Sequence, residues 1–252
     1  TRDLNNGAFS SLLVTGVVGP GEGDMIGYAR EMGVSPLVLP ELRNDVAPLR
    51  DLRAFLKVFS VLRRERPDII HTHTAKAGLH GRAAGVVYNI WARLHGLQPA
   101  KLVHTFHGHV FRGYFSPLKS KALVLVERLM AWFTHRIVAV SEKIKDDLVH
   151  LYRVCPESKV EVVPVGLDFG WTRKLKDARG TLRREMGMPS DCLTVGIVGR
   201  LTAIKNHELL LRAASACRMP NARFFVIGDG ERRAELNALS DRLGLNGRVV
   251  FT

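Results

Sequence analysis

Short apolar runs alternate with longer amphipathic stretches along the first two thirds of the chain. The apolar runs have strand length and are bounded by polar or turn-forming residues. The strands predicted in this way are 11–16, 36–40, 68–73, 101–106, 136–141 and 159–165. Apolar residues recur at helical spacing between them, which predicts helices over 22–32, 48–65, 76–94, 117–134 and 142–152. This alternation indicates a parallel sheet covered by helices on both faces.

A second alternation follows a polar and basic stretch at 167–190. It predicts strands and helices in the order 193–198, 206–217, 222–227, 231–243 and 248–251. We interpret the polar stretch as a domain boundary and predict one domain over 1–166 and another over 167–252. The fold class expected is α/β, with a parallel sheet in each domain.

Composition and charge narrow the classes of partner. The chain has 252 residues, 46% of them hydrophobic, and a formal net charge of +13, so anionic ligands are expected. The basic residues are spread along the chain, which favours phosphate ligands or an anionic membrane surface over nucleic acid. Three cysteines far apart in sequence form no metal-ligand or redox pair. We therefore expect a cytoplasmic protein that binds no nucleic acid, with the inner face of the cytoplasmic membrane as a further location.

The stretch "TVGIVGRLTAIKNHELLLRAA" at 194–214 combines a strand, a glycine, two cations and a helix start. Ligands of open parallel sheets bind beyond the carboxyl ends of the strands, where Gly199 leaves the predicted strand. Arg200 and Lys205 would then project toward the ligand. Asn206 is a suitable N-cap, and the helix it begins would add free N–H donors for a diphosphate. The alternative is that both cations are solvated surface charges.

Several motifs together resemble those of one enzyme family. "GIVGRLTAIKNHELLLRA" and "FFVIGDGERRAELNALSDRLGLNGRVVF" resemble the donor-binding domain of family-four retaining glycosyltransferases of the GT-B fold. "PDIIHTHTAKAG", "HTFHGHVFRGYFSP", "RIVAVSE" and "VEVVPVGLD" are similar in type and order to the acceptor-binding half. Within the family, the chain is most similar to bacterial enzymes of surface-polysaccharide assembly. Motifs in the correct order along the whole chain are more specific than any single motif.

This resemblance implies the α/β GT-B fold, with two Rossmann-like domains facing a cleft, the first without its first strand and the second incomplete in this chain. It also implies a reaction and its charged residues. It makes Arg200 and Lys205 the pair that binds the donor diphosphate and, with His107, the catalytic residues. Fixed cations stabilise the charge that develops on a leaving nucleoside diphosphate, so neither a cofactor nor a metal ion is expected. The donor expected is a UDP-sugar, with GDP-sugars second. The acceptor is a glycan or a lipid-linked sugar, and the configuration is retained.

Further site residues follow from the same resemblance. His107 corresponds to the family histidine that reaches the donor sugar; the alternative is a histidine that only caps a strand end. Gly108 follows it, and His109 is a second choice for the same role. The "GDG" motif, Gly228, Asp229 and Gly230, is placed near the nucleotide, whereas a tight turn that needs glycine explains it as well.

Two histidines two residues apart suggest the acceptor side of the site. His71 and His73 lie on the same face of a predicted strand, which is also how some zinc sites begin. No suitable third ligand accompanies them in sequence, and we expect them to shape the acceptor side. Lys76, shortly after, is a candidate for an acceptor phosphate.

The helix predicted over 117–134 allows two interpretations. Its charged residues, Glu127 among them, are expected on one side and its large apolar residues against the core. The alternative is membrane contact through the apolar side chains and nearby lysines. Ser141 is expected to cap the helix that follows the strand at 136–141.

Two family elements are not found in the 252 residues: the first strand with its glycine-rich loop, and a Glu-x7-Glu motif. We therefore expect the chain to be truncated at both ends and this chain alone to turn over poorly. Two other functions stay open, a nonenzymatic module that binds nucleotide sugars or phosphate and a GT-B-fold UDP-N-acetylglucosamine epimerase.

Overall fold

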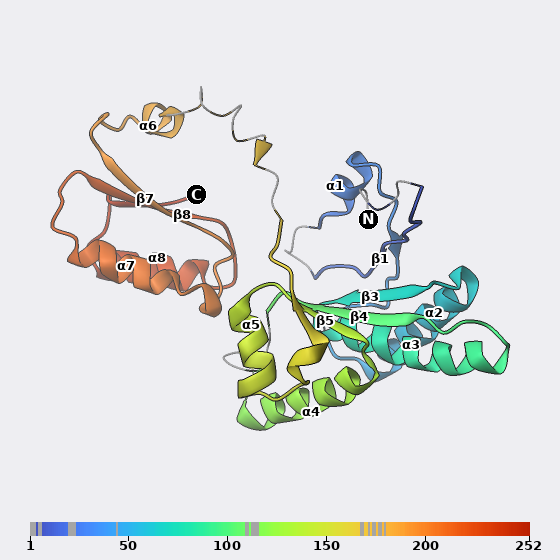
Figure 1. The fold of residues 1–252 in the computed structure, drawn as a ribbon. Helices are drawn as coiled ribbons and strands as arrows, with labels where there is room; N and C mark the ends of the chain where they lie inside the picture. Colours follow the sequence, from blue (N-terminus) through green and yellow to red (C-terminus); the bar gives the residue numbers. More distant parts are fainter. Residues whose placement is uncertain are drawn as a thin grey trace. The chain divides into compact units, whose positions relative to one another are not determined.

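The structure, a computed structural model, divides into two compact units, residues 1–166 and residues 167–252. The residues that it describes are 4, 7–19, 24–43, 45–108, 111, 116–166, 169, 170, 172, 175, 178 and 180–252. Figure 1 shows both units as ribbons. Each unit is described by itself below, as unit 1 and unit 2.

Unit 1 is built on a parallel sheet of four strands. The strands are β3 (Ile69–His73), β4 (Lys101–Phe106), β5 (Arg136–Ala139) and β6 (Val160–Val162), and their order in the sheet follows their order in the chain. A separate parallel pair consists of β1 (Val14–Thr15) and β2 (Leu37–Val38). The predicted strands 11–16 and 36–40 are thus each reduced to two residues. Beyond the two strands, single backbone hydrogen bonds continue the pairing: the amide of Leu39 donates to the carbonyl of Thr15 at 2.8 Å, and the amide of Val17 donates to the carbonyl of Leu42 at 3.2 Å.

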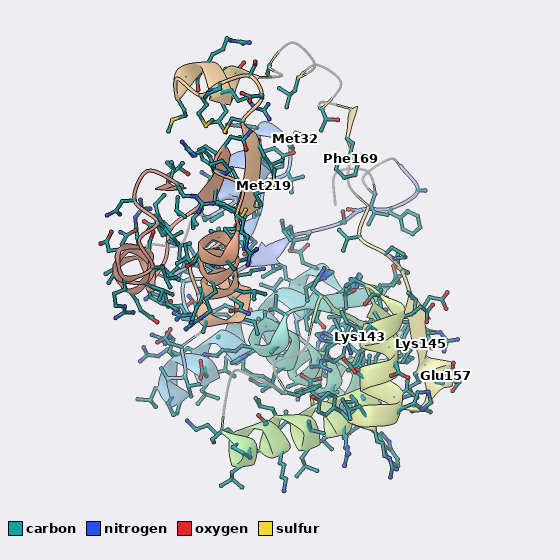
Figure 2. All side chains as sticks on the ribbon, turned by 90° about the vertical axis from the view of Figure 1, so that its left-hand side faces the viewer. Met32, Lys143, Lys145, Glu157, Phe169 and Met219 are labelled. Carbon is teal, nitrogen blue, oxygen red and sulfur yellow. The ribbon has the colours of Figure 1, made fainter. Side chains whose placement is uncertain are left out.

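The helices of unit 1 follow the predicted pattern closely. They are α1 (Ile26–Glu31), α2 (Pro48–Glu65), α3 (Ala75–Leu94), α4 (Pro117–Phe133) and α5 (Glu142–Asp146). The helix predicted over 142–152 changes to a π-helical turn at Asp147–Leu151. Ser141 caps α5 as predicted, since its hydroxyl accepts a hydrogen bond from the amide of Ile144. Lys145 of α5 forms a 2.8 Å ion pair with Glu157, just before β6 (Figure 2).

Strand order decides where the helices lie. Crossovers between parallel strands are right-handed, so a sheet whose order follows the chain keeps successive helices on one side. In Figure 1, α2, α3 and α4 accordingly lie along one face of the β3–β6 sheet. This differs from the prediction of helices on both faces, which needs a reversal of strand order.

Glycines bring α3 unusually close to this sheet. A Cβ atom at Gly78 would lie 2.5 Å from the ring of His104, and one at Gly81 would lie 2.6 Å from Thr72. A Cβ atom at Gly85 would lie 2.6 Å from Leu102. These glycines recur at i, i+3 and i+7, on one face of the helix. They therefore let the backbone of α3 rest directly on β3 and β4.

The prediction for the faces of α4 is wrong. Glu127 is buried, because its carboxylate pairs with the guanidinium of Arg82 on α3 at 2.8 Å. The apolar residues that take the opposite face are exposed by 58–81%, and they are Leu118, Leu125, Leu129 and Trp132. Their spacing of 7, 4 and 3 residues aligns them in one stripe along the helix. We call this set the α4 stripe.

Unit 2 repeats the same construction. Its strands β7 (Leu193–Val198), β8 (Ala222–Ile227) and β9 (Val249–Phe251) form a parallel sheet in chain order. Helices α7 (His207–Ala216) and α8 (Arg233–Arg242) pack against each other on one face (Figure 1). A short helix that the sequence did not predict, α6 (Thr181–Glu185), precedes β7. The core of the unit includes Leu201, Leu211, Phe224 and Leu236.

Candidate functional site

Two loops leave the sheet of unit 2 at the same edge, because β7 and β8 are parallel. The backbones of these loops stay paired beyond the strand ends. The amide of Gly199 donates to the carbonyl of Ile227 at 3.0 Å, and the amide of Leu201 donates to the carbonyl of Asp229 at 2.9 Å. The carbonyl of Leu201 accepts from the amide of Arg232 at 3.1 Å. The loops 199–201 and 228–230 therefore form one rigid platform, the loop pair.

The two glycines of the "GDG" motif permit this close pairing. Gly228 has a φ of +137°, and a Cβ atom there would lie 2.3 Å from the carbonyl oxygen of Gly199. A Cβ atom at Gly230 would lie 2.7 Å from the backbone of Leu201. The exposed Asp229 carboxylate accepts a hydrogen bond from the amide of Gly230. Glycine is thus required here by the contact between two backbones.

The predicted cations stand at the loop pair. The alkyl chain of Lys205 lies over Gly199, with its Cδ 3.9 Å from where a Cβ of that glycine would be. Arg200 and Lys205 are both exposed. Lys205 ends a 3-10 turn at Ala203–Lys205 that leads into α7.

Asn206 departs from the prediction. It occupies the N-cap position of α7, but its φ of +51° is left-handed and its side chain makes no capping hydrogen bond. Asparagine tolerates this conformation, and it turns the chain sharply between Lys205 and the first helical residue. Its role is therefore to shape the turn rather than to cap the helix.

Histidines gather at the corresponding edge of the unit 1 sheet. His73 ends β3, and His107 follows the last residue of β4. The Nδ1 atom of His73 lies 2.9 Å from the Nε2 atom of His107. His71, on the same face of β3, stacks on His73 with ring centroids 4.4 Å apart. Its Nε2 atom lies 2.8 Å from the Thr105 hydroxyl.

A buried layer supports these histidines. The Thr72 hydroxyl lies 2.8 Å from Nδ1 of His104, and both residues are buried beneath α3. Burial and the charge of Arg82 lower the pKa of His104 to about 2. Burial and the neighbouring imidazoles lower the pKa of His73 to about 4, and burial also lowers the pKa of His71. These three rings are therefore neutral at physiological pH.

The residue after His73 has an unusual backbone. Thr74 has φ +64° and ψ 165°, a region that glycine occupies almost alone. Such a conformation costs about 1–3 kcal/mol and persists only where the surroundings impose it. Thr74 separates His73 from the first residue of α3, so the strain lies directly beside the histidines.

The remaining predicted residues have different surroundings. The ammonium of Lys76 is held by the carboxylate of Asp51 at 2.6 Å and by the carbonyl of Asp45. An acceptor phosphate at Lys76 would have to compete with these contacts. Gly108 is exposed, with open space where a Cβ would be. His109 lies outside the described residues.

Sequence reasoning missed the partners of the histidines. Thr105 forms the contact with His71 from the neighbouring strand. Two further features were also missed: the strained backbone of Thr74 beside the histidines, and the ion pair of Asp51 with Lys76. Only the parallel register of β3 and β4, in which His73 is opposite Thr105, could have indicated the contact between Thr105 and His71.

Among the described residues, no group of three or more His, Cys, Asp or Glu side chains could hold a metal ion. No helix in this part of the chain is long and apolar enough to cross a membrane.

Two Rossmann-like α/β units, each with polar residues at the carboxyl ends of its parallel strands, define a protein of the GT-B fold. The chain belongs to Glycosyltransferase Family 4, whose family model matches residues 15–170. A second family model, described as glycosyl transferases group 1, matches residues 178–252.

Individual proteins agree with this assignment. The chain is 29% identical over 214 residues to UDP-Gal:alpha-D-GlcNAc-diphosphoundecaprenol alpha-1,3-galactosyltransferase of Escherichia coli, covering 81% of this chain and 51% of that protein. It is 26% identical over 220 residues to the capsular polysaccharide biosynthesis glycosyltransferase CapM of Staphylococcus aureus, covering 85% and 54%. The crystal structure of Anabaena HepE in complex with UDP and glucose has the same fold, with a TM-score of 0.71, 21% identity, and coverage of 94% and 60%. The chain spans about half the length of the curated relatives it matches.

Proposed function

We propose that the loop pair binds the diphosphate of a UDP-sugar, and that the protein transfers the sugar to a glycan or lipid-linked acceptor in cell-surface polysaccharide synthesis. The observation that carries this proposal is the position of Lys205. Its alkyl chain lies across Gly199 on a platform held by backbone hydrogen bonds at the carboxyl ends of two parallel strands. The name of the E. coli relative, which contains UDP-galactose and a diphosphoundecaprenol-linked sugar, supports the donor base and the acceptor class.

The chemistry assigned to the loop pair is electrostatic. Cleavage of the bond between the sugar and the phosphate places negative charge on the departing nucleoside diphosphate. Lys205 and Arg200 belong to a platform whose backbone is already hydrogen-bonded, and in this proposal their charges stabilise the leaving diphosphate in the transition state. In this proposal the two side chains do the work for which a metal ion is otherwise used. The configuration of the transferred sugar is retained.

Unit 1 is assigned to the acceptor and to the sugar. His107 contacts the donor sugar, while His71, His73 and Gly108 border the acceptor. A neutral imidazole suits this task, because it can hydrogen-bond a hydroxyl group without adding a charge. The pKa of His73, lowered to about 4 by burial and the neighbouring imidazoles, keeps His73 neutral beside it.

The α4 stripe is assigned to the membrane. An apolar stripe with basic side chains beside it is the pattern of a helix that lies in the surface of an anionic bilayer. Lys121 and Arg128 are on the same helix, and Arg128 is anchored by hydrogen bonds to the carbonyl of Tyr152. A lipid-linked acceptor would be reached from this position at the inner face of the cytoplasmic membrane.

Titration calorimetry of the chain with UDP and with GDP, at low and at high salt, tests the donor assignment. We expect UDP to bind more tightly than GDP, and Lys205→Met and Arg200→Met each to weaken UDP binding by about tenfold or more. Arg242→Met, which removes an exposed cation from the end of α8, is the matched control and should bind UDP as the unmodified chain does. Equal binding of UDP, GDP and inorganic diphosphate, with no effect of the two variants, would refute the proposal.

A further inference from the structure

We propose that His73 is a positioning residue that fixes the tautomer of His107, so that His107 offers its Nδ1 atom as a hydrogen-bond acceptor. This inference rests on the proposed function, because it concerns the histidine assigned to the donor sugar. It names the part of the sugar that His107 recognises, a hydroxyl group that donates.

The geometry places one proton between the two rings. Nδ1 of His73 and Nε2 of His107 are 2.9 Å apart, a distance that requires one nitrogen to donate and the other to accept. Two donors would repel each other, and two acceptors would have no proton to share. The tautomers of the two rings are therefore coupled.

The direction of this hydrogen bond follows from the chemistry of histidine. A neutral histidine side chain carries its proton preferentially on Nε2. When His107 donates from Nε2 to Nδ1 of His73, both rings keep this preferred form. The opposite direction would force both rings into the less favoured form with the proton on Nδ1. The favoured arrangement leaves Nδ1 of His107 without a proton.

The surroundings of His73 hold its ring in place. His71 stacks on it and is itself anchored to the Thr105 hydroxyl at 2.8 Å. The strained backbone of Thr74 follows directly in the chain. Two neighbours thus restrict the ring of His73, whereas His107 stands at the start of a loop. His73 therefore determines the tautomer of His107, and not the reverse.

This arrangement selects the ligand group. With its Nε2–H directed at His73, His107 can only accept a further hydrogen bond, through Nδ1. A sugar hydroxyl can donate to that nitrogen, but an ether oxygen or a phosphate oxygen cannot. The site therefore distinguishes a free hydroxyl on the donor sugar from the same position carrying a methyl ether.

Long-range proton–nitrogen correlation spectra of the 252-residue chain, with ¹⁵N-labelled histidine, test the inference at neutral pH. In the unmodified chain we expect His107 to show one protonated nitrogen, Nε2, and one unprotonated nitrogen, Nδ1, with well separated shifts. In His73→Phe, which keeps a ring but no nitrogen, the two His107 shifts should converge as the tautomers mix. In His73→Asn, whose side-chain oxygen can accept at the place of Nδ1, the separation should return.

His150→Phe provides the matched control, since His150 is an exposed histidine of the same unit. It should leave the His107 signals unchanged. A His107 ring protonated on Nδ1, or shifts unchanged in His73→Phe with the backbone amide spectrum preserved, would overturn the inference. If His73→Phe fails to fold, His73→Leu, which also has no acceptor at this position, takes its place in the same comparison. Because the spectra need no nucleotide, a failure here is separate from a failure of UDP to bind at the loop pair.

Discussion

Arg82 on α3 and Glu127 on α4 form an ion pair inside unit 1, where the Arg82 side chain is fully buried. One guanidinium nitrogen lies 2.9 Å from Oε1 and 2.8 Å from Oε2 of the carboxylate. The Nε atom of Arg82 donates to the carbonyl of Gly78 at 3.1 Å. Burial raises the pKa of Glu127, and the charge of Arg82 offsets part of this rise. The pair joins α4 to the helix that rests on the histidine-bearing strands.

Removing one partner of this ion pair should destabilise the chain more than replacing both partners by apolar residues. Removing one partner leaves a buried charge without compensation, so Glu127→Leu should lower the free energy of unfolding by about 3–5 kcal/mol. The double variant Arg82→Met with Glu127→Leu removes both charges and should recover most of that loss. Urea unfolding followed by circular dichroism measures the three values. Strict additivity of the two single variants would contradict this expectation.

Gly228→Ala should damage the loop pair. The new methyl group would lie 2.3 Å from the carbonyl oxygen of Gly199, and a φ of +137° is unfavourable for alanine. We expect a loss of stability of about 3 kcal/mol, measured by native-state hydrogen exchange of the β7 and β8 amides. Gly244→Ala has a φ of +65° but open space around it, so it should cost only about 1 kcal/mol. Equal losses in both variants would show that close packing at Gly228 does not matter.

Acid should destabilise the chain through His104. Its pKa is lowered to about 2 in the folded state, while in the unfolded state it has its ordinary value of about 6.5. The unfolded state therefore binds more protons between these values, and stability falls as the pH drops below about 6.5, by about 1.4 kcal/mol per pH unit. Urea unfolding gives the free energy of unfolding at pH 7 and at pH 5. The loss between these two pH values should be about 2 kcal/mol larger in the unmodified chain than in His104→Gln. His150→Gln, at the surface, should keep the pH dependence of the unmodified chain.

The α4 stripe should govern binding to lipid vesicles. Trp132 is 81% exposed, and its transfer into the surface of a bilayer removes apolar area from water. Trp132→Ser should weaken sedimentation with vesicles of phosphatidylglycerol by about tenfold. Leu209→Ser, at an exposed leucine on α7 of unit 2, should have no such effect. If vesicle binding depends on salt concentration and is unchanged in Trp132→Ser, the interaction is due to net charge and not to the α4 stripe.

The local pattern of apolar and polar residues was enough to predict the bounds of several strands and helices. The bounds of β4, β7, β8 and α2 agree with the sequence predictions. The three strands are mostly apolar, the apolar residues of α2 recur at helical spacing, and each element is followed by polar or turn-forming residues. β1 and β2 were overestimated because their length depends on pairing that no local pattern contains.

Side-chain partners far apart in sequence escaped prediction. The charge of Glu127 suggested a solvent-facing position, but its partner Arg82 stands 45 residues earlier. The spacing of His71 and His73 correctly indicated a shared face of one strand. That Thr105 and His107 would meet them depends on the register between β3 and β4, which only the folded sheet defines.

The strained backbone of Thr74 implies a trade-off between thermal stability and activity. Glycine at this position would relieve a conformation that a β-branched residue adopts at a cost of about 1–3 kcal/mol, and the chain would gain stability. The same change would free the segment between His73 and α3 and loosen the ring that orients His107. Selection for thermostability would thus favour glycine at residue 74, and selection for turnover would favour threonine.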